Sequence, residues 1–282
     1  MFNLASLEPV DYLVIGHLTC DIIPGGLRLG GAASYVSRTA KAMGLRVGVV
    51  TAWGNEIALS EMAGIQIIAA PAEHSTTFEN IYTPKGRIQY IHHQAARLDF
   101  SLVPEVWRRT PIIHLAPMAQ EVDATLPDGF HPTLLGLTPQ GWMRTWGDDR
   151  LVHPCDWKDA EAALPKAGAV CMSIEDIGFN EEWIEHFMLS TPILALTEGR
   201  EGLRLYWNRD MRRFRAPEVK VVEATGAGDV FAASFFIRLY QTRDPWEAAR
   251  FAVRMSAISV TRAGLGGVPT PEEVQQCLTE VY

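Results

Sequence analysis

Residues 223–231, Glu-Ala-Thr-Gly-Ala-Gly-Asp-Val-Phe, hold the side chain and backbone groups of this chain that are best suited to chemistry. The valine-rich run 219–222 before them predicts a strand, and the apolar run Val230–Tyr240 after them predicts a buried helix. Small residues would then lie at a strand-to-helix turn, where a ligand can approach the backbone closely. Because the first N–H groups of a helix are free and its dipole is positive there, such a turn binds anions. Asp229 beside it is a candidate base for phosphoryl transfer.

The same five residues, Thr-Gly-Ala-Gly-Asp, also fit an ordinary turn. Aspartate is favoured at the N-cap of a helix, so the function of Asp229 can be to accept hydrogen bonds from the first helical turn. The short motif alone leaves both interpretations open, and the rest of the chain must decide between them.

Composition and charge exclude several classes of partner. The chain has 282 residues, 48% of them hydrophobic, and a formal net charge of −8. This acidic balance argues against nucleic acid or an anionic membrane as a partner, although backbone N–H groups can still bind ATP. Four scattered cysteines without a Cys-x-x-Cys pair are typical of a reducing compartment. With no signal-peptide pattern and no apolar run near the ~20 residues that span a bilayer, we expect a cytoplasmic protein.

Short apolar runs alternate with helical segments over most of the chain. This alternation predicts an α/β architecture, with a mostly parallel sheet covered by helices on both faces. Ligands of such sheets bind beyond the C-terminal ends of the strands. The expected strands are Tyr12–Ile15, Val47–Thr51, Ile65–Ala69, Ile112–Leu115, Leu134–Leu137, Ala169–Met172, Ile193–Thr197 and Leu203–Trp207, and the expected helices besides Val230–Tyr240 are Ala32–Met43, Asn180–Leu189 and Pro245–Thr261.

One segment interrupts the alternation. Thr76–Thr83 and Arg87–His93 are rich in strand formers and flank Pro84-Lys85-Gly86, which predicts a β-hairpin. We expect this hairpin to form a flap over the sheet.

Four short stretches of sequence form a set whose order and spacing are specific. They are residues 16–21 (Gly-His-Leu-Thr-Cys-Asp), 29–36 (Leu-Gly-Gly-Ala-Ala-Ser-Tyr-Val), 197–202 (Thr-Glu-Gly-Arg-Glu-Gly) and 225–229 (Thr-Gly-Ala-Gly-Asp). With them the chain resembles the ribokinase-like (PfkB) sugar kinases over nearly its full length. The resemblance implies one domain over residues 1–282, a three-layer α/β sandwich with a mostly parallel central sheet and a small β flap, or lid. The lid would comprise residues 21–30, expected to be a short loop, and residues 74–98.

The resemblance also implies a mechanism. Asp229 would take the proton from the acceptor hydroxyl, and the N–H groups of Gly226, Ala227 and Gly228 would stabilise the charge on the γ-phosphoryl group as an anion hole. Mg²⁺ would bridge the phosphates of ATP.

Further candidate residues come from the position of the strands and from the family pattern. Gln140 and Arg144 follow the strand Leu134–Leu137, at the sheet end where ligands bind, and are either substrate contacts or surface residues. The implied acceptor contacts are Thr19, Asp21, Gly30, Gly31 and Tyr35, and the implied nucleotide contacts are Thr197, Gly199, Gly202, Thr225, Gly226 and Gly228.

Three positions depart from the family pattern. Glu223 replaces an Asp near the family's monovalent-cation site, which leaves K⁺ dependence open. Asp176 ends Ser-Ile-Glu-Asp, where the family supports Mg²⁺ through water with Asn-x-x-Glu. Tyr35 replaces a substrate-binding Asn, which makes this stretch more similar to the inositol-kinase branch.

We therefore expect an ATP-dependent kinase for a hydroxyl of a small sugar or cyclic polyol, with a myo-inositol-like acceptor favoured. One alternative is a nucleoside kinase of the same family, in which Tyr35 or Phe78 would stack on a base. The other is a non-catalytic sugar-binding regulator, which would not need Asp229. A homodimer is compatible with all three.

Overall fold

The computed structural model describes residues 7–83 and 86–279 and is built on a nine-stranded sheet. Seven parallel strands are extended at one edge by the antiparallel strands β14 (Leu203–Trp207) and β15 (Asp210–Phe214). From β13 outward the parallel strands are β13 (Ile193–Thr197), β12 (Ala169–Ser173), β9 (Leu134–Leu137), β8 (Ile112–Leu115), β1 (Tyr12–Ile15), β4 (Val47–Trp53) and β5 (Gln66–Pro71).

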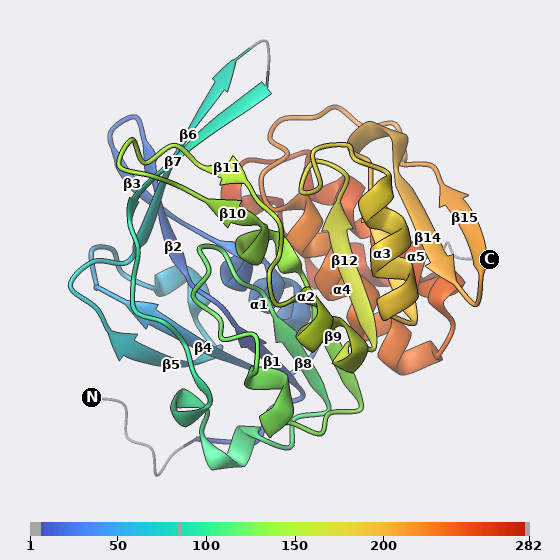
Figure 1. The fold of residues 1–282 in the computed structure, drawn as a ribbon, viewed down its shortest axis with the longest axis horizontal. Coiled ribbons are helices and arrows are strands. Elements are labelled where there is room, and N and C mark those ends of the chain that lie inside the picture. Colours follow the sequence, from blue (N-terminus) through green and yellow to red (C-terminus); the bar gives the residue numbers. More distant parts are fainter. Residues whose placement is uncertain (1–6, 84–85, 280–282) are drawn as a thin grey trace.

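Helices cover both faces of this sheet, which confirms the predicted three-layer sandwich (Figure 1). Alternate residues of β1 face opposite sides of the sheet: Tyr12 and Val14 belong to one apolar cluster, and Leu13 and Ile15 belong to the other. One layer holds α1 (Ala32–Ala42), α4 (Ala227–Thr242), α5 (Pro245–Ser259) and, packed on α5, α6 (Pro271–Thr279), and the other holds α2 (Ala160–Ala163) and α3 (Glu182–Ser190).

A second sheet has the order β3-β2-β6-β7 and projects from the sandwich as the lid (Figure 1). The predicted hairpin is confirmed as β6 (Thr76–Thr83) and β7 (Gly86–His93), with Thr83 paired to Gly86. The first arm was expected to be a loop, and that expectation is wrong. Residues 19–30 form a second hairpin of β2 (Thr19–Ile23) and β3 (Gly26–Gly30), which Gly25 permits with φ 93°.

The predicted strand at 219–222 is also wrong. The segment has no strand partner, and Val222 is 57% exposed. Valine favours strands, but here the N–H groups of Val222 and Glu223 donate to Val260 O at the end of α5 instead of to a strand. The predicted strand Leu203–Trp207 is confirmed as β14, which runs antiparallel to β13.

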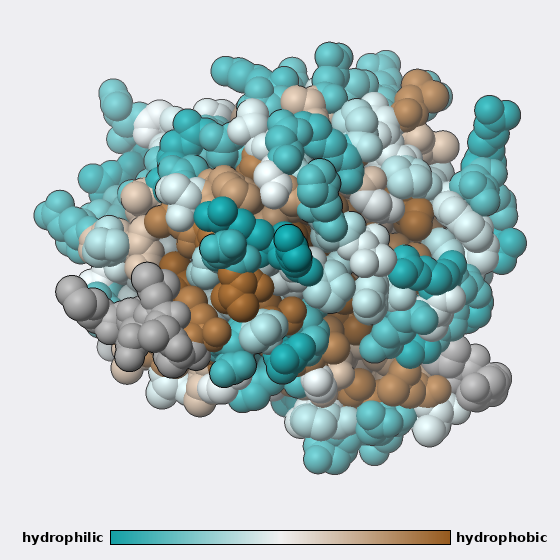
Figure 2. All heavy atoms as spheres, turned by 90° about the horizontal axis from the view of Figure 1, so that it is seen from below, coloured by the Kyte–Doolittle hydropathy of each residue, from teal (hydrophilic) through white to brown (hydrophobic). Residues whose placement is uncertain are grey.

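The end of the molecule opposite the β6–β7 hairpin carries areas of apolar side chains among polar ones (Figure 2). Strand β12 points away from that end, so the C-terminal strand ends, where ligands of such sheets bind, lie toward the lid (Figure 1). Among the described residues, no helix is long and apolar enough to span a bilayer.

Candidate active site

The motif at 225–229 forms the N-terminus of α4. Gly226 is the N-cap with φ 82°, and Asp229 is the third residue of the helix rather than its cap. The Ala227 N–H donates to Ala224 O over 3.2 Å. Within residues 7–83 and 86–279, the N–H groups of Gly226 and Gly228 have no backbone acceptor. These two N–H groups are therefore free for an anion, whereas that of Ala227 is engaged in this structure.

The two glycines of the motif have different surroundings. A Cβ at Gly226 would lie 2.3 Å from the ring of Tyr35, whereas a Cβ at Gly228 would meet nothing within 4 Å. Gly226 is thus required by close packing and by its positive φ. Gly228 instead faces an open space at the start of the helix.

Asp229 is half-buried beside this space. Desolvation raises its pKa to about 7, with Asp176 also raising it and Arg144 and Arg87 lowering it. A carboxylate with this pKa can accept a proton near neutral pH. Of the two arginines, only Arg144 was singled out from the sequence, since nothing in the pattern of β7 marks Arg87.

The candidate acceptor residues form one cluster at the base of the lid. Asp21 lies within β2, is 6% exposed, and has its pKa raised to about 6, chiefly by burial. Gly30 lies directly against the Asp21 carboxylate and Gly31 against Thr19. Burial is the main cause of the raised pKa of Tyr35, and the charges of Asp21 and Asp229 raise this pKa further. Tyr35 therefore lies near both carboxylates.

Two hydroxyl groups of this cluster have no hydrogen-bond partner among the described residues. They are Thr19 Oγ1 and Tyr35 Oη, and both are buried. Buried polar groups are nearly always paired in native proteins, so these two hydroxyls point to a ligand rich in hydrogen-bonding groups.

Glu223 is engaged by the lid. Arg28 of β3 binds its two carboxylate oxygens at 2.8 and 3.2 Å, and the Gly264 N–H donates to it over 3.1 Å. Burial opposes ionisation, but the Arg28 hydrogen bonds lower the pKa of Glu223. The carboxylate expected near a monovalent cation is therefore already neutralised by a guanidinium.

A surface recess lies between α5 and the segment after β15, and of the candidate nucleotide residues Gly202 packs against that segment. Thr197 ends β13, and the turn Gly199–Gly202 packs on the backbone that follows β15. Ser256 of α5 donates to Ala227 O over 3.0 Å, which fixes α5 beside the start of α4. The recess, of about 330 Å³, is lined by Phe214, Arg215, Ala216, Pro217, Arg250, Val253 and Arg254.

Asp176 and Gln140 form one unit. The Gln140 amide donates to Asp176 Oδ1 and the Ser173 N–H to Oδ2, both over 2.9 Å. Among the described residues, no group of three or more His, Cys, Asp or Glu side chains could hold a metal ion. Asp176 keeps free lone pairs for a metal-bound water, so it fits an outer-shell position for Mg²⁺.

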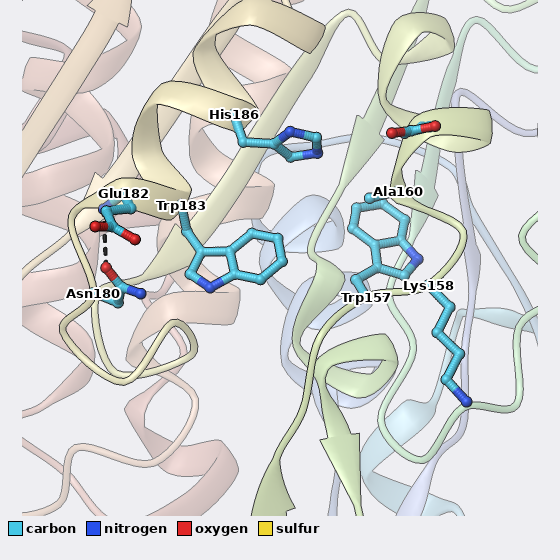
Figure 3. A pocket seen from close by; sticks show the side chains of 8 residues that line it. Trp157, Lys158, Ala160, Asn180, Glu182, Trp183 and His186 are labelled. Carbon is cyan, nitrogen blue, oxygen red and sulfur yellow. Dashed lines mark hydrogen bonds between the residues drawn. The ribbon is translucent and has the colours of Figure 1, made fainter.

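A further cavity, with a volume of about 440 Å³, lies between α2 and α3 (Figure 3). Trp157 and Trp183 line it from the two segments, but Trp157 is only 4% exposed because it stacks on Trp142 at 4.7 Å. None of the predicted site residues lines this cavity.

The pfkB family carbohydrate kinase model matches residues 180–272. The ribokinase of Bacillus subtilis is 38% identical over 89 residues, which cover 30% of each chain. The cytidine kinase of Thermococcus kodakarensis is 25% identical over 86% of this chain and 94% of its own. The inositol 3-kinase of Oryza sativa subsp. japonica is 25% identical over 95% and 72%, respectively.

Solved structures share the whole fold. A pyrophosphate-dependent kinase in the ribokinase family, complexed with a pyrophosphate analog and myo-inositol, has a TM-score of 0.79 at 17% identity. The alignment covers 94% of this chain and 99% of that one. The ribokinase of Thermotoga maritima has a TM-score of 0.73 at 20% identity, covering 96% and 100%.

Proposed function

Because the chain belongs to the ribokinase-like (PfkB) carbohydrate kinase family, we propose that it transfers the γ-phosphoryl group of ATP to a hydroxyl of a small cyclic polyol. One observation carries this proposal. Asp229, with its pKa of about 7, stands at the N-terminus of α4 near a cluster with one buried carboxylate and two buried hydroxyls that have no partner among the described residues.

A polyhydroxylated ring can form hydrogen bonds with all the polar groups of that cluster. The Asp21 carboxylate can accept hydrogen bonds from two vicinal hydroxyls, and Thr19 and Tyr35 can each donate one and accept another. A myo-inositol-like ring offers such hydroxyls on every side. The myo-inositol bound to a structural neighbour and the inositol 3-kinase relative support this acceptor class.

The chemistry follows from the elements that meet at α4. Asp229 takes the proton of the acceptor hydroxyl as its oxygen attacks the γ-phosphorus. The Gly226 and Gly228 N–H groups and the helix dipole stabilise the transferred phosphoryl group. Mg²⁺, held by the donor phosphates with Asp176 in its outer shell, would neutralise phosphate charge.

The recess beside α5 supports a nucleotide donor. Some structural neighbours are pyrophosphate-dependent kinases, and pyrophosphate, unlike ATP, needs no binding site for a nucleotide base. Val253 in the recess lies three residues, or about 4.5 Å of helix rise, before Ser256, which binds Ala227 at the start of α4. A nucleotide base bound in this recess would therefore lie one to two helical turns from the anion hole. The arginines that line the recess would then lie near the phosphate donor.

The cytidine kinase relative, which matches nearly its whole length, supports a nucleoside acceptor as the second candidate. The rings that would stack on its base are already packed, that of Tyr35 against Gly226 and that of Phe78 beside the Arg144 guanidinium. We therefore favour the polyol. A non-catalytic regulator would have no use for an ionisable Asp229. We further propose that residues 1–282 act as one domain in the cytoplasm, with residues 21–30 and 74–98 as the lid.

The test is a panel of inositols, pentoses, hexoses and nucleosides, assayed with MgATP and separately with pyrophosphate. We expect acceptor-dependent ADP release with a cyclic polyol. Asp21→Asn should raise the acceptor KM by about 10–100-fold and leave the ATP KM within about twofold, because charged hydrogen bonds are lost. Asp11→Asn, at the opposite end of the sheet, is the matched control. Turnover only with a phosphorylated sugar would show that the acceptor class and the role of Asp21 are wrong.

A further inference from the structure

Arg144 is a buried cation without an anionic partner. It opens the short strand β10 (Arg144–Thr145) and is 7% exposed. Its side chain makes one hydrogen bond among the described residues, from Nη1 to Met118 O over 3.3 Å. In residues 7–83 and 86–279, no carboxylate oxygen lies within the 4.0 Å that defines an ion pair with it.

Three other buried or partly buried arginines pair directly with carboxylates. Arg28 binds Glu223 at 2.8 Å, Arg204 binds Glu198 at 2.7 Å, and Arg238 binds Glu247 at 2.5 Å. Burying a charge without a partner costs several kcal/mol. Burial lowers the pKa of Arg144 to about 10, which still leaves the guanidinium protonated at neutral pH. Asp176, Asp229 and Glu121 balance this charge only at longer range, so among the described residues no carboxylate occupies the donors of the guanidinium, and they can bind the oxygens of an anionic ligand.

The position of Arg144 is fixed by the segment after β8. Met118 O accepts from its guanidinium, and the Gln120 side chain donates to its backbone carbonyl. Glu121 holds this segment, because its fully buried carboxylate accepts from the Met118 N–H over 2.9 Å and the Ala119 N–H over 2.7 Å. Arg144 is thus pre-organised rather than free to seek a partner.

The surroundings of Arg144 indicate where such a ligand would bind. Its guanidinium carbon lies 5.9 Å from the ring of Phe78, which pairs with Asp21 across the lid strands. Arg144 is also close enough to Asp229 to lower its pKa. The guanidinium therefore lies near both a lid strand that pairs with Asp21 and the candidate base.

We propose that Arg144 binds the oxygens of the phosphoryl group during its transfer, an inference that rests on the proposed function. The acceptor oxygen forms its bond to the γ-phosphorus, its proton goes to Asp229, and the bond to the bridging oxygen breaks with release of ADP. One Nη1 hydrogen bond leaves the other donors of the planar guanidinium for two phosphoryl oxygens. Arg144 would thus stabilise charge on the phosphoryl group together with the N-terminus of α4.

The test compares Arg144→Gln and Arg144→Lys with Arg108→Gln. Arg108 is the matched control because it also donates to one backbone carbonyl, Val103 O, and lies over a phenylalanine ring, that of Phe100, away from the site. We expect Arg144→Gln to lower kcat by about 10²–10³-fold, Arg144→Lys to retain more activity than Arg144→Gln, and Arg108→Gln to stay within about twofold of the wild type. Acceptor affinity, measured by calorimetry without donor, should change by less than about twofold. Guanidinium ion should restore kcat of Arg144→Ala at least about tenfold.

Three results would overturn the assignment. Unchanged kcat in Arg144→Gln would show that the guanidinium is structural, as would loss of activity with a lowered melting temperature and no guanidinium rescue. A loss of acceptor affinity as large as the loss of kcat would show that the anion belongs to the acceptor. Each differs from failure of the proposed function, in which the wild type itself transfers no phosphoryl group.

Discussion

Replacing each of the two glycines of the α4 motif by alanine separates the effect of packing on stability from the effect on catalysis. Gly226→Ala places a Cβ 2.3 Å from the buried Tyr35 ring, at a residue whose φ is 82°. Gly228→Ala places a Cβ inside α4 with nothing within 4 Å. The first change should therefore damage the fold, and the second should fill only the space proposed for the phosphoryl group.

The magnitudes follow from these surroundings. A left-handed alanine costs about 1–2 kcal/mol. Forcing a methyl group into packed surroundings costs about 1–3 kcal/mol. Gly226→Ala should thus lower the free energy of unfolding by about 2–5 kcal/mol, or the melting temperature by roughly 5–15 °C for a chain of this size. Gly228→Ala should raise stability by about 0.5–1 kcal/mol, because alanine is preferred to glycine within a helix.

Thermal melting and steady-state kinetics measure the two effects. Gly228→Ala should melt no lower than the wild type yet lose about tenfold or more in kcat/KM for ATP, because its methyl group blocks one contact of the anion hole. Adding Tyr35→Leu to Gly226→Ala should recover about 1–3 kcal/mol of the lost stability, since the clash is shared. Full activity in Gly228→Ala would refute the assignment of that space to the phosphoryl group.

The remaining predictions concern titration, lid motion and cations. Because Asp229 must be ionised to act and its pKa is about 7, kcat/KM for the acceptor should fall about tenfold per pH unit below 7 and level off above it, which a pH–rate profile checks. The raised pKa means that ionisation destabilises the folded state, so Asp229→Asn should melt higher than the wild type at pH 8 and equally at pH 4; the reverse order would contradict the burial argument. Amide hydrogen exchange in β6–β7 should be fast in the free protein and slow with acceptor bound, whereas equal protection would indicate a fixed element. Because Arg28 neutralises Glu223, exchanging K⁺ for Na⁺ should change kcat by less than about twofold, and a larger K⁺ activation would show that a cation competes with Arg28.

Local sequence patterns predicted those elements that have a clear composition or turn signal of their own. The β6–β7 hairpin, the buried parallel strands and α4 were all recognised from composition, turn residues and apolar runs. β15 was missed because Asp210–Phe214 is mostly charged and exposed, so it has no strand-like alternation. The run 219–222 has the opposite property: its composition favours a strand, but its described hydrogen bonds go to Val260 at the end of α5 and not to a strand.

The candidate site was predictable only where a motif carries it. Asp229, Gly226 and Gly228 form such a motif, and the structure places them together at one helix end. The Arg28–Glu223 pair joins residues 195 positions apart, which no spacing rule detects. The environment of Arg144 depends likewise on segments far apart in the sequence, so its unpaired charge becomes visible only in the fold.

The most direct test of the account asks whether Asp229 is a base or only a helix residue. Asp244 serves as the control, because it caps α5 by accepting hydrogen bonds from the N–H groups of Trp246 and Glu247. With MgATP and the best polyol at pH 8, Asp229→Ala should lower kcat by about 10²–10⁴-fold without a lower melting temperature. Asp244→Ala should lose about 1 kcal/mol of stability and keep kcat within about twofold. If Asp229→Ala instead melts lower, as Asp244→Ala does, and retains more than about a tenth of wild-type kcat, Asp229 is a structural residue and the proposed mechanism is wrong.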